Sequence, residues 1–175
     1  WYPLRHPNVL PLYGACHIST PRLLLFLDAA HGLAYLHSRA VPIVHANLKC
    51  SNLLVMADGT GVVSDFEYAF ARASSNMSAQ EQSSSMRWKA PECLEFGNAA
   101  VKSGANARVE SDVYSLGMCV YEALTGHEPF HELNDVDFLV AVENDKKMPP
   151  RPDGVCSDDE WSLIQAMCAH KFQDR

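Results

Sequence analysis

Apolar residues recur at a helical period most clearly between residues 112 and 126. Val113, Leu116 and Val120 lie three or four positions apart, and Tyr121 and Leu124 continue the same stripe. Ser111 stands where a helix N-cap is expected, and Gly126 followed by Pro129 is a typical stop signal. The pattern predicts a helix over 112–126 with Ser111 as its cap.

Two further stretches have the same period. One runs from 21 to 37, with Thr20 as expected cap and Pro21 at the first helical position, where proline is favoured. Its apolar stripe consists of Leu23, Phe26, Leu27, Ala30, Leu33 and Ala34. The other follows Ser157 and Glu160, which have the spacing of a capping box. Its stripe consists of Trp161, Ile164 and Cys168. We expect an amphipathic helix in each stretch.

Short strands are indicated elsewhere. The apolar residues at 53–55 and 62–63 flank a turn at 57–59, which predicts a hairpin. The run 9–14 suits an edge or entry strand, and the Ser-, Ala- and Asn-rich stretches 71–85 and 97–108 favour surface loops. The predicted fold class is therefore mainly α with short β-hairpins.

Composition restricts the function. The 175 residues, 47% of them hydrophobic, suffice for one domain, and no run reaches the length of a membrane span. A net charge of −7 with dispersed Lys and Arg argues against nucleic-acid binding. The first residues lack a signal-peptide pattern and the six cysteines are scattered, which favours free thiols and a cytoplasmic location.

Four short motifs follow one another in a fixed order. They are His45-Ala46-Asn47-Leu48-Lys49-Cys50-Ser51-Asn52, Asp65-Phe66-Glu67, Arg87-Trp88-Lys89-Ala90-Pro91-Glu92 and Ser111-Asp112-Val113-Tyr114-Ser115-Leu116-Gly117. In this order they resemble the large C-terminal lobe of a eukaryotic protein kinase. The segments 32–37 and 118–126 resemble the corresponding sequences of the tyrosine-kinase-like group of serine/threonine kinases, and those of its oomycete members in particular.

The resemblance implies roles for five residues. Asn47 occupies the position of the catalytic base, Lys49 would neutralise the transferred phosphoryl group, and Leu54 would lie against the adenine ring. Asn52 and Asp65 would bind magnesium, which prefers such oxygen ligands. ATP and Mg²⁺ are thus the implied cofactors, and a protein is the implied substrate or partner.

The resemblance also implies structural contacts. Glu92 is expected to pair with Arg175, and Asp112 to hold the backbone of the catalytic loop. His45, Phe66 and Leu12 are expected to stack as part of the apolar column of the family. Ser85 stands where serine/threonine kinases carry a hydroxyl that braces the base and the lysine.

Several departures weaken the expectation of catalysis. Asn47 has no useful basicity, and a general base contributes roughly 10²–10⁴ in rate. Ala46 replaces an arginine that would grip a phosphorylated loop, and Glu67 replaces a glycine. By this resemblance, residues 1–20 are expected to be a remnant of the small lobe and linker, and residues 21–175 an incomplete large lobe. The roof of the nucleotide site would then be missing, which makes ATP binding doubtful.

Three functions remain open from the sequence. The chain is a pseudokinase that acts by protein interaction, a serine/threonine kinase with residual activity in a longer form, or a truncated fragment without function. We prefer the pseudokinase hypothesis, because the base is lost although Lys49, Asn52 and Asp65 remain.

Overall fold

The computed structural model describes residues 22–71, 83–94 and 107–175. The strand predicted over 9–14, the cap Thr20 and the stacking residue Leu12 lie outside the described residues, as do most of the two predicted loops. The described part consists mainly of helices with two small antiparallel sheets. This confirms the predicted fold class.

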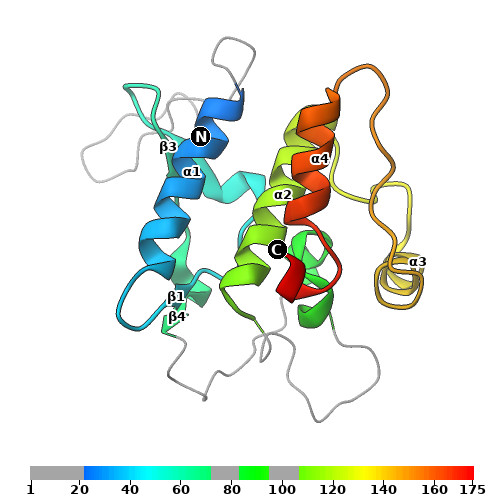
Figure 1. Cartoon of the computed structure of the whole chain (residues 1–175), viewed down its shortest axis with the longest axis horizontal. Helices are drawn as coiled ribbons and strands as arrows, with labels where there is room; N and C mark the ends of the chain where they lie inside the picture. Colours follow the sequence, from blue (N-terminus) through cyan, green and yellow to red (C-terminus); the bar gives the residue numbers. More distant parts are fainter. Residues whose placement is uncertain (1–21, 72–82, 95–106) are drawn as a thin grey trace.

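Helix α2, Val109–Thr125, forms the centre of the molecule. Figure 1 shows α1, Arg22–His37, on one side of it and α4, Asp158–Met167, on the other. Its central residues are buried on every side, among them Met118 and Cys119, which are fully buried. A helix without a solvent-facing side serves as the scaffold on which the other elements pack.

The start of α2 differs from the prediction. The helix begins at Val109 with Arg108 as its N-cap, so Ser111 lies in the first turn. Its hydroxyl accepts a hydrogen bond from the Arg108 backbone N–H at 3.1 Å and donates one to Glu92 Oε1 at 2.8 Å. The predicted end is confirmed, because Gly126 adopts the left-handed conformation at the C-cap, with φ of 74°.

Helix α1 is confirmed, but its buried face is rotated from the predicted stripe. Ala29 and Leu33 are buried, whereas Leu27 is half exposed and Ala34 is exposed. Leu24 is likewise 53% exposed. The helix is apolar around most of its circumference, so periodicity alone did not fix which side faces the core.

The predicted hairpin is confirmed as β2, Leu53–Val55, paired with β3, Gly61–Val63. The Gly61 backbone N–H donates to Asp28 Oδ2 at 3.0 Å and thereby fixes the hairpin to α1. A Cβ atom at Gly61 would lie 2.7 Å from a backbone oxygen of α1, so the strand approaches that helix too closely for a side chain. A second antiparallel pair, β1 (Ile43–Val44) with β4 (Phe70–Ala71), was not predicted.

Helix α4 begins with the predicted capping box, in which Ser157 and Glu160 exchange hydrogen bonds. It packs closely on α2 at Gly117, where an added Cβ would lie 2.5 Å from Cys168 Sγ. Helix α3, Asp135–Leu139, was not predicted and continues as a π-helix over Val140–Asn144.

Short 3₁₀ turns connect these elements. They span Cys50–Asn52, Phe66–Tyr68, Ser83–Trp88, Pro91–Cys93 and Phe172–Asp174. None of the helices in the described ranges is both long enough and apolar enough to cross a bilayer.

Candidate active site

The loop after β1 is held by a buried carboxylate of α2. Asp112 is 1% exposed, and its two oxygens accept the backbone N–H groups of His45 at 2.8 Å and Ala46 at 2.9 Å. His37, the last residue of α1, donates its Nε2–H to the same carboxylate at 2.9 Å. The expected grip of Asp112 on the loop is confirmed, whereas the part of His37 was not foreseen.

This grip holds the loop in a strained conformation. Ala46 has φ of 63°, in the left-handed region that costs a residue with a Cβ atom about 1–2 kcal/mol. The hydrogen bond from its own N–H to Asp112 Oδ1 stabilises that turn. The turn carries the chain from the buried His45 to Asn47, whose side chain contacts Asp65 in the segment after β3.

The His45 ring connects the loop to the segment after β3. Its Nε2–H donates to the Ser64 carbonyl oxygen at 2.9 Å, so Nδ1 is left as the acceptor for the Asn47 N–H at 3.3 Å. The Phe66 ring lies edge-on to it, with the centroids 5.1 Å apart. The expected stacking of His45 and Phe66 is confirmed.

Three predicted site residues meet at one carboxylate oxygen. Asn47 Nδ2 donates to Asp65 Oδ2 at 3.0 Å, and Asn52 Nδ2 donates to the same oxygen at 3.1 Å. Asn52 Nδ2 also donates to the Asn47 carbonyl oxygen at 2.7 Å. Both asparagines are buried, whereas Asp65 is exposed. Because an ionised carboxylate only accepts hydrogen bonds, the amide nitrogens must face it.

Part of this cluster fits a magnesium ion. The amide nitrogen of Asn52 donates to two acceptors, which leaves its side-chain oxygen Oδ1, whose one contact among the described residues is a long hydrogen bond of 3.5 Å from the Ser51 hydroxyl, as a hard oxygen ligand. Asp65 Oδ1 has no hydrogen-bond donor among the described residues. These two oxygens are the ligands that Asn52 and Asp65 offer, whereas Asp65 Oδ2 is already engaged.

Lys49, Leu54 and Ser85 flank the cluster in different ways. Lys49 precedes the 3₁₀ turn Cys50–Asn52 in extended backbone, and its ammonium group has no ion pair with a described residue. Leu54 is a half-buried residue of β2, and Ser85 is buried. Their expected roles toward nucleotide and phosphate stay predictions.

A buried ion pair stabilises the side of the lobe near the C-terminal residue. The Arg175 guanidinium makes a two-pronged contact with Glu92, at 2.7 Å and 3.0 Å, and donates its remaining N–H groups to backbone carbonyl oxygens. Burial raises the pKa of Glu92, but the hydrogen bonds and the charge of Arg175, together with hydrogen bonds from the Glu92 backbone and Ser111, outweigh it and leave this pKa below the usual value. The predicted Glu92–Arg175 pair is confirmed.

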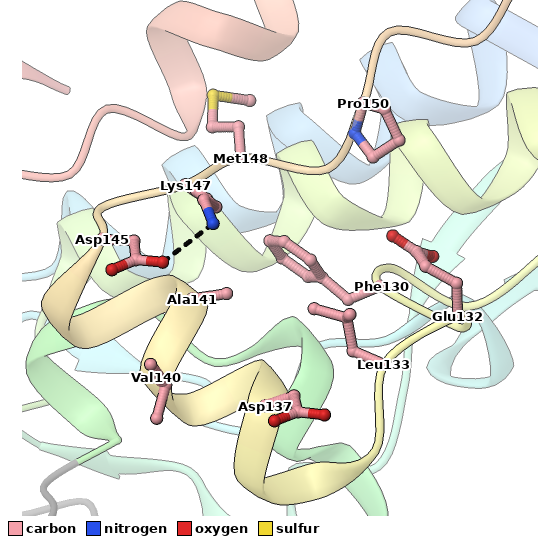
Figure 2. A pocket seen from close by; sticks show the side chains of 10 residues that line it. All are labelled: Phe130, Glu132, Leu133, Asp137, Val140, Ala141, Asp145, Lys147, Met148 and Pro150. Carbon is pink, nitrogen blue, oxygen red and sulfur yellow. Dashed lines mark ion pairs between the residues drawn. The ribbon is translucent and has the colours of Figure 1, made fainter.

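A cavity of about 460 Å³ lies elsewhere, beside α3 and the π-helix. Figure 2 shows the Phe130 ring and the Leu133 side chain among the residues that line it, and the ion pair between Lys147 and Asp145, which is 2.8 Å long. No residue of the 45–52 loop or of the 64–67 segment lines it. The cavity offers no nucleophile with an adjacent base, so the candidate chemistry belongs to the loop.

Comparison with known proteins places this site in a family. The protein tyrosine and serine/threonine kinase family matches residues 15–175. A probable serine/threonine-protein kinase of Dictyostelium discoideum is 31% identical over 95% of the chain, and the serine/threonine-protein kinase CTR1 of Arabidopsis thaliana is 37% identical over 69%. The serine/threonine-protein kinase TNNI3K of Mus musculus is 34% identical over 64% of the chain.

The chain corresponds to only 11–14% of the length of these three relatives. The matched family nevertheless covers the loop, the Asp65 segment, the Glu92–Arg175 pair and α2. This chain belongs to the protein kinase family, and it is similar to serine/threonine kinases of the tyrosine-kinase-like group.

Proposed function

We propose that this chain is a kinase domain of serine/threonine ancestry with impaired phosphoryl transfer, a pseudokinase that acts by protein interaction. The observation that carries the proposal is the Asn47 side chain at the position of the base. Its amide nitrogen donates a hydrogen bond to Asp65. A group that donates to its neighbour and has no basicity cannot take the proton of a substrate hydroxyl.

Phosphoryl transfer requires that proton to leave. The hydroxyl oxygen attacks the γ-phosphorus of ATP, the bond to the bridging oxygen breaks, and ADP departs with the electron pair. Magnesium, when bound, neutralises the phosphate oxygens during this exchange. With Asn47 the proton has no side-chain acceptor, and the loss of a general base corresponds to about 3–5 kcal/mol of barrier.

The remaining site residues support the second candidate, a kinase with residual activity. Lys49 would neutralise the transferred phosphoryl group, and Asn52 and Asp65 would hold the metal through the oxygens described above. Leu54 would contact the adenine ring. The geometry of these groups is compatible with ATP and Mg²⁺, so activity has to be measured and not only inferred from Asn47.

Phosphate transfer from labelled ATP to a generic serine- and threonine-containing substrate tests the catalytic part. We expect the wild-type rate to equal that of Asp65→Asn, which lacks the metal carboxylate. The chain would be an active kinase if the wild-type rate were at least about tenfold above the rate of Asp65→Asn and if Lys49→Ala lost this activity. Asn47→Asp then tells whether the amide is the sole defect.

Complementation tests the interaction part. In cells lacking the gene, the whole protein carrying Lys49→Ala should restore the phenotype as well as wild type does, because interaction does not need the phosphoryl-binding lysine. Failure of Lys49→Ala at normal protein abundance would show that the cell requires catalysis and would contradict the proposal.

A further inference from the structure

We infer that the Asn47 amide is a built-in competitor of magnesium. It occupies Asp65 Oδ2, so that only Asp65 Oδ1 is left to a metal unless an amide is displaced, and the site binds divalent cations weakly. The inference rests on the proposed function in one respect, namely that Asn52 and Asp65 form the metal end of a kinase site. It goes beyond that function, because it assigns Asn47 a positioning role in place of a missing catalytic one.

The first argument is the number of acceptor sites on one oxygen. A carboxylate oxygen has two lone pairs in the carboxylate plane, and Asp65 Oδ2 accepts one N–H from Asn47 and one from Asn52. Both distances, 3.0 Å and 3.1 Å, are ordinary hydrogen-bond lengths. Asp65 Oδ1 stays available to a cation, but a cation held by both oxygens of Asp65 would have to displace one of the two amides.

The second argument concerns which amide can leave. Asn52 is held by its additional bond to the Asn47 carbonyl oxygen at 2.7 Å. The Asn47 side chain has no further hydrogen bond to a described residue, and its contact with Asp65 is the bond that a metal held by both Asp65 oxygens has to break. The cost of displacing Asn47 is therefore subtracted from the affinity for the ion.

The third argument is electrostatic. With an aspartate at position 47, two carboxylates would face each other where the amide and the carboxylate now lie 3.0 Å apart. Like charges at such a distance repel, and a divalent cation between them removes the repulsion. The asparagine supplies a neutral hydrogen-bond donor instead. The metal-free site therefore has no repulsion between carboxylates that a bound cation would relieve.

Direct metal titration of the chain without nucleotide tests the inference. Mn²⁺ serves as the probe in electron paramagnetic resonance, and Mg²⁺ in thermal unfolding. Asn47→Ala, which removes the donor without adding charge, should bind Mn²⁺ about tenfold more tightly than wild type, the value of one hydrogen bond to a charged acceptor. Asn47→Asp should bind more tightly still.

Thermal unfolding provides an independent measurement. In EDTA, Asn47→Asp should have the lowest Tm of the three proteins, and saturating Mg²⁺ should raise it by about 3 °C or more, because binding to the folded state adds stability. The Tm of wild type should change by less than about 1 °C under the same conditions. Asp65→Asn should abolish the Mg²⁺ response in every background.

Asn134 offers a matched control. Its amide nitrogen donates to Asp137 Oδ2 at 2.7 Å on the exposed start of α3, so Asn134→Asp introduces the same change beside another aspartate. We expect no Mg²⁺-dependent Tm and no gain in Mn²⁺ affinity there. Equal responses of Asn134→Asp and Asn47→Asp would reduce the effect to added surface charge and overturn the inference.

The decisive outcome is the order of affinities. The inference is overturned if wild type binds Mn²⁺ as tightly as Asn47→Ala. If Asn47→Asp does not fold in EDTA, the comparison of wild type with Asn47→Ala still decides. Phosphate transfer is measured separately, so an active wild type that shows the predicted order would refute the pseudokinase proposal and leave the metal competition intact.

Discussion

The replacement of Asp112 is the most informative test of how this lobe holds its loop. Asp112→Asn keeps the size of the side chain but exchanges one acceptor oxygen for an NH₂ group. The two carboxylate oxygens accept different backbone N–H groups, from His45 and from Ala46. One of these donors would therefore face another donor in a buried environment.

The expected loss in the free energy of unfolding follows from the number of buried N–H groups that lose their acceptor. A buried donor without an acceptor costs about 1–3 kcal/mol, so Asp112→Asn should lower the free energy of unfolding by about 2 kcal/mol. Asp112→Ala leaves both buried backbone groups without an acceptor and should cost about 4 kcal/mol. The third donor, His37 Nε2–H, is not counted because its side chain is partly exposed. That is a large part of a typical domain stability of about 5–15 kcal/mol.

Urea unfolding followed by circular dichroism measures both variants, and hydrogen exchange of the His45 and Ala46 amides reports on the loop itself. Both amides should lose protection in Asp112→Ala by more than the loss of global stability explains. Asp153→Asn, an exposed carboxylate without a hydrogen bond to a described residue, is the control and should change stability by less than about 0.5 kcal/mol. A loss below about 1 kcal/mol in Asp112→Asn, with unchanged exchange, would refute the reasoning.

Three further predictions concern the scaffold. The contact with Arg175 lowers the pKa of Glu92 in the folded state. The stability that Glu92 contributes is therefore complete above the ordinary pKa of 4.5 and is lost as the pH falls below it. In urea titrations at acid pH, the difference in unfolding free energy between wild type and Glu92→Gln should shrink. Gly117→Ala should destabilise the chain by about 1–3 kcal/mol in urea, because its Cβ would strike α4. The matched variant Gly32→Ala lies within α1, and its Cβ would meet nothing nearer than the Val63 side chain of β3 at 3.5 Å, an ordinary contact distance, so it should be neutral or stabilising. Ala46→Gly should raise the unfolding free energy by about 0.5–1 kcal/mol, since relief of the left-handed strain exceeds the added chain entropy, and an unchanged or lower urea midpoint would contradict this.

Much of the site was predictable from the sequence. The order of motifs identified Asn47, Asn52 and Asp65 as one group, and the Glu92–Arg175 pair and the Asp112 contacts agree with the resemblance. The direct hydrogen bond from Asn47 to Asp65 was not foreseen. It depends on the left-handed turns at positions 46 and 65, with φ of 63° and 65°, which carry no glycine to signal them.

The two ends of α2 also differ in how well the sequence predicted them. Its end was predictable because Gly126 is a local signal, whereas its start moved from Ser111 to Val109. The Ser111 hydroxyl accepts from the Arg108 backbone and donates to Glu92, a residue distant in sequence. The pattern that favours serine at a cap could not distinguish a cap from a first-turn position that has a tertiary partner.

The sequence by itself determined the elements whose causes are local. The β2–β3 hairpin follows from its turn, the α4 capping box from two residues three positions apart, and the helical stripe of α2 from its period. Each depends on neighbours within a few residues, so the pattern is sufficient.

Tertiary structure alone decided how these elements meet. The rotation of α1, the β1–β4 pair and α3 with its π-helix depend on contacts between segments far apart in the chain. So does the meeting of Asn47 with Asp65, which requires α2 to hold the loop through Asp112 while the segment after β3 presents the carboxylate. The sequence shows that position 47 is an asparagine, but the packing of these segments determines that its side chain contacts Asp65.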